Sequence, residues 1–217
     1  MIDKLNEQQV LDWVDGILHI TAGPSNPAPV YARELEHVLR EGHSAWKVSD
    51  HIDALERRQD TTVTSAAHHA TETARSAGRP ASAVRLEEAW SAAYGLHPEP
   101  SRAFSRAILA VEAVAVPAIV PNKADATLGH VLGQLRNQGH LYELAIVDKT
   151  GAPSSVEALT GLVGLLWEGH TDRHEGNRPA LPITQEAAEM AVHAAAVLVQ
   201  WFSSGAIRRT GAGDRRS

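Results

Sequence analysis

The chain contains no cysteine among its 217 residues. That absence excludes a disulfide scaffold, thiol catalysis and zinc sites built on thiolates. Aromatic residues are scarce as well, at five Trp, three Tyr and two Phe, and this disfavours a β-rich fold because strands prefer aromatic and β-branched side chains. Long apolar runs are also missing, since the stretch 109–120 is interrupted by Glu112 and Pro117. We therefore expect no membrane span.

Positive charge is in the minority. The formal net charge is −6, so a broad nucleic-acid surface is not expected and any RNA contact must be local. Met1–Lys4 shows no charged-then-apolar leader, and we expect a soluble, cytoplasmic protein. Phosphate-binding glycine loops, nucleophile elbows and dinucleotide fingerprints are absent. The twelve histidines show no metal-ligand spacing. The sequence predicts no metal and no cofactor.

Alanine is abundant, with 35 residues, and alanine loses no side-chain entropy in a helix. Apolar residues recur at helical spacing along most of the chain. We predict an all-α fold. Segment 141–147 is apolar and fits either a short strand or a helical turn. Ser154 and Glu157 have the spacing of a capping box that starts a helix. The predicted helices are 3–20, 30–41, 44–58, 82–94, 98 to either 117 or 121, either 125 or 127 to 139, 154–167 and 184–205.

Composition divides the chain into regions. Between residues 56 and 83 the only large apolar residue is Val63, which predicts a weakly apolar linker or an exposed helix. We assign 1–97 to a smaller helical N-terminal region and 98–205 to a helical bundle. Residues 206–217 carry four arginines and one aspartate and are expected to form a basic, disordered tail.

The densest polar cluster lies at residues 168–178. An Arg and a His held between two packed helices can cleave RNA without a metal, because the His moves a proton and the Arg binds the phosphate through two N–H groups. The alternative is a charged loop in which Asp172, Arg173 and Glu175 pair with one another and with water.

Three segments carry a resemblance to a known family. They are residues 107–114 around Glu112, residues 126–135 with Thr127-Leu-Gly129, and Leu165-Leu-Trp167 followed by Asp172-Arg-His-Glu-Gly176 and the helix 185–192. In this order they resemble the C-terminal domain of abortive-infection proteins, within the HEPN group of helical domains, over about residues 100–205. The resemblance implies a HEPN-like antiparallel bundle, a role in anti-phage defence, and a homodimer that cuts RNA without a metal.

The same resemblance implies the site residues. His174 falls at the position of the family's His, whereas Trp167 or Glu168 stands where the family has its Arg, so the motif is degenerate. Arg173 and His174 are the candidate catalytic residues. His170 and Arg178 are the candidate substrate-binding residues.

Two other functions stay open. One is a non-catalytic, antitoxin-like module for dimerisation or for binding a partner protein through the N-terminal region. The other is a small-molecule sensor with its pocket between the two halves. The RNA-directed and the non-catalytic interpretations differ in whether Arg173 and His174 act on RNA.

Two further expectations concern packing. Glu112 lies among inward-facing apolar residues and needs a partner, so we predict a structural salt bridge with Arg136 or Arg173. The helix at 184–204 is apolar or small on more than one face. A partner subunit is the expected cover, which predicts a two-fold homodimer.

Overall fold

The computed structural model describes residues 6–22, 29–169 and 182–210. These residues form eight α-helices and four three-residue strands, so the expected all-α character is confirmed, with two small sheets added. The chain packs as two compact units. The first comprises Met1–Thr61 and Tyr94–Pro98, and the second comprises Thr62–Ala93 and Glu99–Ser217.

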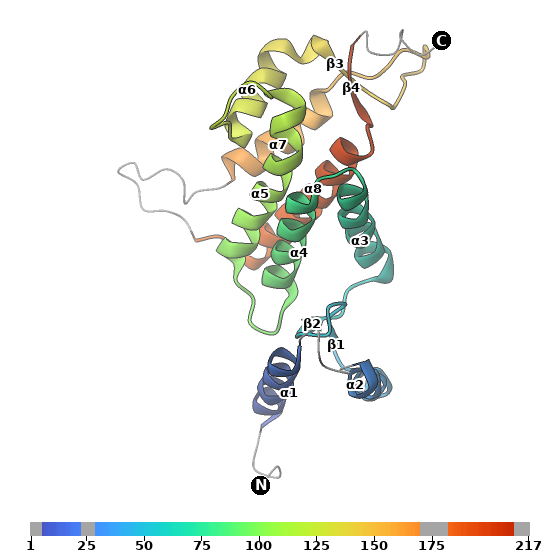
Figure 1. The fold of residues 1–217 in the computed structure, drawn as a ribbon, viewed down its shortest axis with the longest axis vertical. Coiled ribbons are helices and arrows are strands. Elements are labelled where there is room, and N and C mark those ends of the chain that lie inside the picture. Colours follow the sequence, from blue (N-terminus) through green and yellow to red (C-terminus); the bar gives the residue numbers. More distant parts are fainter. Residues whose placement is uncertain (1–5, 23–28, 170–181, 211–217) are drawn as a thin grey trace. The chain divides into compact units, whose positions relative to one another are not determined.

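The first unit pairs two helices with a hairpin (Figure 1). Its helices are α1 (Glu7–Thr21), which begins at a capping box between Asn6 and Gln9, and α2 (Pro29–Glu41). Strands β1 (Trp46–Val48) and β2 (Leu55–Arg57) pair antiparallel. The core is small and is centred on Leu18, Leu55 and Leu96. Leu96 belongs to the short segment that returns to this unit from further along the chain.

The helix predicted at 44–58 is wrong, because this region forms the β1–β2 hairpin. The Ser49 hydroxyl donates to Asp53 Oδ1 at 2.7 Å, and the Ser49 amide donates to the Ala54 carbonyl at 2.9 Å. Ile52 has a left-handed φ of 59°, a conformation that a helix does not contain. The turn therefore reverses the chain, and Leu55 reaches the core from a strand.

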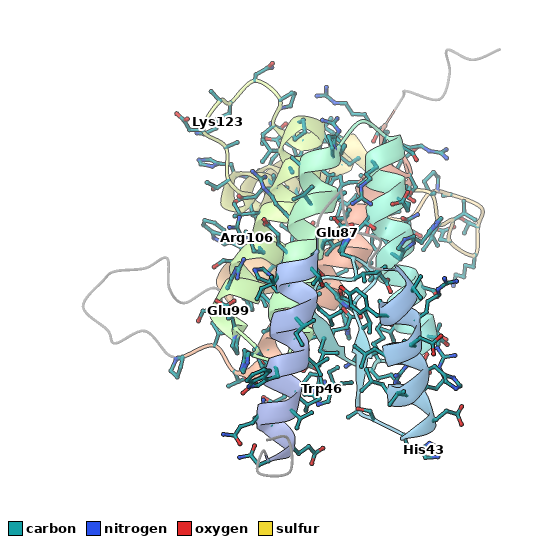
Figure 2. The ribbon with its side chains drawn as sticks, turned by 60° about the horizontal axis from the view of Figure 1, so that its bottom comes forward. His43, Trp46, Glu87, Glu99, Arg106 and Lys123 are labelled. Atoms are coloured by element: carbon teal, nitrogen blue, oxygen red, sulfur yellow. The ribbon has the colours of Figure 1, made fainter. Side chains whose placement is uncertain are left out.

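The second unit begins with the region predicted to be a weakly apolar linker or an exposed helix. Residues Thr61–Ser76 form α3, and Pro80–Tyr94 form α4. An ion pair from Arg75 to Glu87 links the two helices; Glu87 is labelled in Figure 2. The region is thus helical but not simply exposed, because small side chains allow close packing. The buried positions of α3 are Ala67, Ala70, Thr71 and Ala74.

Helix α4 packs on α5 (Pro100–Ile119). The Ser82 hydroxyl donates to the Ala110 carbonyl at 2.7 Å, and Arg106 pairs with Glu88 at 3.3 Å; Arg106 is labelled in Figure 2. Val84 of α4 is exposed, while its neighbours Ala83 and Leu86 are buried. The buried face of α4 is formed mainly by alanines together with Leu86.

Four helices form a ring of contacts. Helix α5 packs on both α6 (Leu128–Gln138) and α8 (Gln185–Ser203), and α7 (Glu157–Glu168) also packs on both. Much of helix α8 is covered from within the chain, since Ala191, Val192 and Leu198 are buried, whereas Met190 and Val197 are exposed. The apolar character of α8 is thus accounted for mainly by packing within the chain, and the homodimer stays a prediction.

A second small sheet closes this unit. After the 3₁₀ turn η2 (Gly139–Leu141), strand β3 (Tyr142–Leu144) pairs antiparallel with β4 (Ile207–Arg209). Of the two structures considered for residues 141–147, a short strand or a helical turn, the strand is the one that forms, as β3. The disordered tail predicted from residue 206 is wrong at its start because β4 lies there, and residues 211–217 lie outside the described residues.

The capping box predicted at Ser154 and Glu157 does not form. The Ser154 amide donates to the Ile146 carbonyl at 2.8 Å, and its own carbonyl accepts from the Leu144 amide at 3.1 Å. These bonds hold Ser154 in an extended arm that follows β3. Helix α7 begins instead after Val156, which makes no side-chain cap bond.

Candidate functional site

The four residues of the candidate RNA-cleaving site, His170, Arg173, His174 and Arg178, lie outside the described residues. The structure does describe both ends of the segment that carries them. Helix α7 ends at Glu168 before the segment, and α8 begins after Thr184. The frame around the candidate site is therefore defined by these helix ends and by what they contact.

The end of α7 is fixed against α5. A Cβ atom on Gly169 would lie 3.1 Å from Cζ of Phe104 and 2.9 Å from the Leu165 carbonyl oxygen. Phe104 is buried on α5. The close approach leaves no room for a side chain at residue 169, so the polar segment starts from a defined point at the edge of the bundle.

Arg136 also reaches the end of α7. Its Nη2 lies 2.7 Å from Oε1 of Glu168, and both side chains are more than half exposed. Exposed ion pairs of this kind contribute about 0–1 kcal/mol. The pair nevertheless sets a guanidinium beside Glu168, one of the two residues, with Trp167, at which the resemblance would place an Arg. Arg136 was one of the two partners predicted for Glu112.

Glu112 has a structural contact of a different kind. Its Oε1 accepts a hydrogen bond from the Leu128 amide at 2.8 Å. Leu128 is the first residue of α6, where amide groups have no partner within the helix and the helix dipole favours a negative charge. Glu112 thus ties the middle of α5 to the start of α6. The other predicted partner, Arg173, lies outside the described residues.

The start of α6 meets the end of α7 at one close contact. A Cβ atom on Gly129 would lie 2.5 Å from Cζ2 of Trp167, a distance that no side chain tolerates. The indole therefore rests directly on the backbone of Gly129. Both residues belong to segments that carry the resemblance, but no contact between them was predicted. The sequence feature that could have indicated the contact is a glycine inside a helix beside apolar residues.

The opposite end of the polar segment is also anchored. Thr184 Oγ1 accepts from the Ala187 amide at 3.2 Å and caps α8, at the start of the helix predicted at 184–205. Gln185 Nε2 donates to the Ala93 carbonyl of α4 at 2.6 Å. Both anchors of the segment that holds Arg173 and His174 are thus built into the second unit.

The first unit holds a separate pocket, which the sequence did not indicate. It has a volume of about 330 Å³ and lies between α2 and the turn of the β1–β2 hairpin. Basic side chains of α2 line one wall, and apolar side chains line another. The lining residues are Ala32, Arg33, Glu36, His37, Arg40, Val48, Ser49 and Ile52.

Glu36 is held at several points in this pocket. Arg58 Nη1 donates to Oε1 at 2.9 Å, and the Val48 amide donates to Oε2 at 3.0 Å. Burial raises the pKa of Glu36, but the hydrogen bonds from Arg58 and Val48 and the positive charge of Arg58 outweigh it and lower the pKa overall. Glu36 therefore stays charged and joins α2 to β1 and Arg58.

No family model, no curated protein and no solved structure matches this chain. Within the ranges that the structure describes, no three His, Asp or Glu side chains gather in a way that would hold a metal ion. In the same ranges, no helix combines the length and low polarity needed to cross a membrane.

Proposed function

We propose that this chain is a cytoplasmic, HEPN-like protein of the abortive-infection type, which acts on RNA as a homodimer. The observation that supports the proposal is that the three segments of the family resemblance contact one another. Glu112 of the first bonds the Leu128 amide of the second, and Gly129 of the second receives Trp167 of the third. Segments far apart in sequence that share such contacts form one structural unit.

The proposed activity is metal-independent RNA cleavage in the segment between α7 and α8. Arg173 would bind the scissile phosphate through two N–H groups, and His174 would move a proton at the attacking 2′-hydroxyl or at the leaving oxygen. His170 and Arg178 would bind the neighbouring nucleotides. The chemistry needs no metal because the ribose hydroxyl is the nucleophile.

The experiment measures RNA integrity in cells that express the wild type, Arg173→Ala or His174→Ala. We expect degradation by the wild type and none by either variant. His69→Ala is the matched control, because His69 is exposed on α3. Purified protein in the presence of EDTA should still cut RNA if no metal takes part. Intact RNA with the wild type would contradict the ribonuclease activity.

Two observations favour the non-catalytic alternative. Glu168, which with Trp167 is one of the two residues where the resemblance would place an Arg, is paired with Arg136. The net charge of −6 also opposes RNA binding. In this alternative the bundle serves for dimerisation or binds a partner protein. Unchanged RNA together with a stable dimer would be the expected result.

A further inference from the structure

Helix α1 has two apolar faces. Leu11, Val14 and Leu18 pack into the core of the first unit. The second face consists of Val10, Trp13, Ile17 and Ile20, which we call the α1 stripe. Their side chains are 38%, 65%, 51% and 83% exposed. Four large apolar residues in one exposed row are unusual for a monomer and mark an interaction surface.

The spacing of the α1 stripe indicates the shape of its partner. Its members follow one another at intervals of three, four and three residues. This is the spacing of the a and d positions of a coiled coil, which keeps one row of side chains in register with a second helix. The occupant of the stripe is therefore expected to be a helix.

The residues beside the stripe favour a second copy of the same helix. The flanking e and g positions are Gln9, Val14, Gly16 and Thr21, and none of them is charged. A helix that meets its own copy meets its own charges at these positions, and like charges there repel. Of the acidic residues of α1 within the described range, Asp12 and Asp15 lie at c and f positions, away from the flanks. Glu7 lies at an e position one heptad before Val14, ahead of the first residue of the stripe.

Gly16 makes the stripe complementary to itself. A Cβ atom added to it would meet no described atom within 4 Å. A glycine in a helix interior costs roughly 1 kcal/mol relative to alanine, and no contact within the described chain accounts for it. Gly16 leaves a shallow hole beside Ile17 and Ile20, while Trp13 projects from the same face. A protruding side chain and a hole on one surface suit a two-fold interface.

We propose that the α1 stripe binds the α1 stripe of a second copy of this chain in an antiparallel pair. Centred near Asp15, such a pair sets Trp13 opposite Ile17 of the second copy and Val10 opposite Ile20 of the second copy. The proposal rests on the homodimer of the proposed function and gives it a surface. It is independent of RNA cleavage.

Light scattering of the full chain at micromolar concentration tests the proposal. We expect the wild type at twice the chain mass of 23.3 kDa and Ile17→Glu at the chain mass with unchanged helical circular dichroism. Met190→Glu, at an exposed apolar position on α8, is the matched control and should remain dimeric. Gly16→Ala should weaken the dimer while raising the helicity of the chain.

A wild type at 23.3 kDa would overturn the proposal, and so would an Ile17→Glu variant that stays dimeric. A dimer that is lost in Met190→Glu would place the interface on the bundle instead. A monomer in which the stripe is protected from hydrogen exchange would show that another part of the chain covers it. Because RNA integrity is measured separately, loss of the dimer and absence of cleavage remain distinguishable.

Orientation is tested by cysteine cross-linking, which is simple in a chain without native cysteine. A mixture of Val10→Cys and Ile20→Cys proteins should form a disulfide between the two variants. Each variant alone should cross-link at least tenfold less. Efficient cross-linking of Ile20→Cys to itself would overturn the antiparallel arrangement.

Discussion

At the scale of single residues, the contact between Gly129 and Trp167 is possible because Gly129 has no Cβ atom. The indole occupies the place that any Cβ on residue 129 would take. The contact joins α6 to α7 next to the candidate site. Sequence analysis identified both helices but not this contact, because a glycine in a helix looks the same in sequence whether it is buried or open.

Gly129→Ala should lower the free energy of unfolding by about 1–3 kcal/mol, the usual cost of overpacking. Gly133→Ala is the matched control in the same helix, since a Cβ there meets no described atom within 4 Å. It should raise stability by up to about 1 kcal/mol through helix propensity. Urea unfolding of both variants checks the prediction, and equal effects would contradict the close contact.

At the scale of elements, the sequence was most informative where helices are long and large apolar residues repeat. Helices α2, α5 and α8 lie close to their predicted ranges. The β1–β2 hairpin was missed because the spacing of Trp46, Ile52 and Leu55 fits a helix and because the turn depends on side-chain bonds within it. Helix α3 was uncertain because alanines provide its buried face.

The candidate site was less predictable than the fold. The position of Glu112 at the start of α6 depends on how α5 and α6 pack. In the sequence, the only indication of this contact was a carboxylate among apolar residues. The predicted partners were Arg136, which pairs with Glu168, and Arg173, which lies outside the described residues; the hydrogen bond from the Leu128 backbone amide was not predicted. Backbone groups carry no sequence signal, so such partners escape any pattern of side chains.

Glu36 provides an element-scale prediction, because it joins α2 to the hairpin. Its folded pKa is lowered, so its contribution to stability is present above the ordinary glutamate pKa of about 4.3 and is lost as the pH falls through the lower folded value. Glu36→Gln should cost about 1.5 kcal/mol at pH 7, and this cost should shrink as the pH falls below about 4.3. Thermal unfolding across this range, with exposed Glu34→Gln as control, checks it; a pH-independent difference would contradict it.

At the scale of the whole molecule, the first unit is built from two separate stretches of chain. Residues Tyr94–Pro98 supply Leu96 to its core, and Gly95 forms a bridge with Glu56. The segment Tyr94–Pro98, from the last residue of α4 into the connection to α5, therefore completes a unit whose first stretch ends at Thr61. The boundary predicted near residue 97 did not include this return, since a short connection carries no pattern of its own.

Leu96→Ala should lower the stability of the first unit by about 2–5 kcal/mol, the range for a buried leucine. Hydrogen exchange should rise around Leu18 and Leu55, while α5 and α8 remain protected. Leu165→Ala, at an exposed position on α7, is the control and should leave both regions unchanged. Equal loss of protection in α5 would contradict the division into two units.

The return of Tyr94–Pro98 also has a consequence for synthesis. On the ribosome, α1, α2 and the hairpin emerge first, yet the leucine that closes their core is made only after α3 and α4. The core of the first unit therefore stays incomplete, with its apolar residues exposed, until more than thirty further residues have been translated. A nascent chain of this protein is expected to need chaperone protection early, and a gene fragment that stops at residue 61 is expected to aggregate.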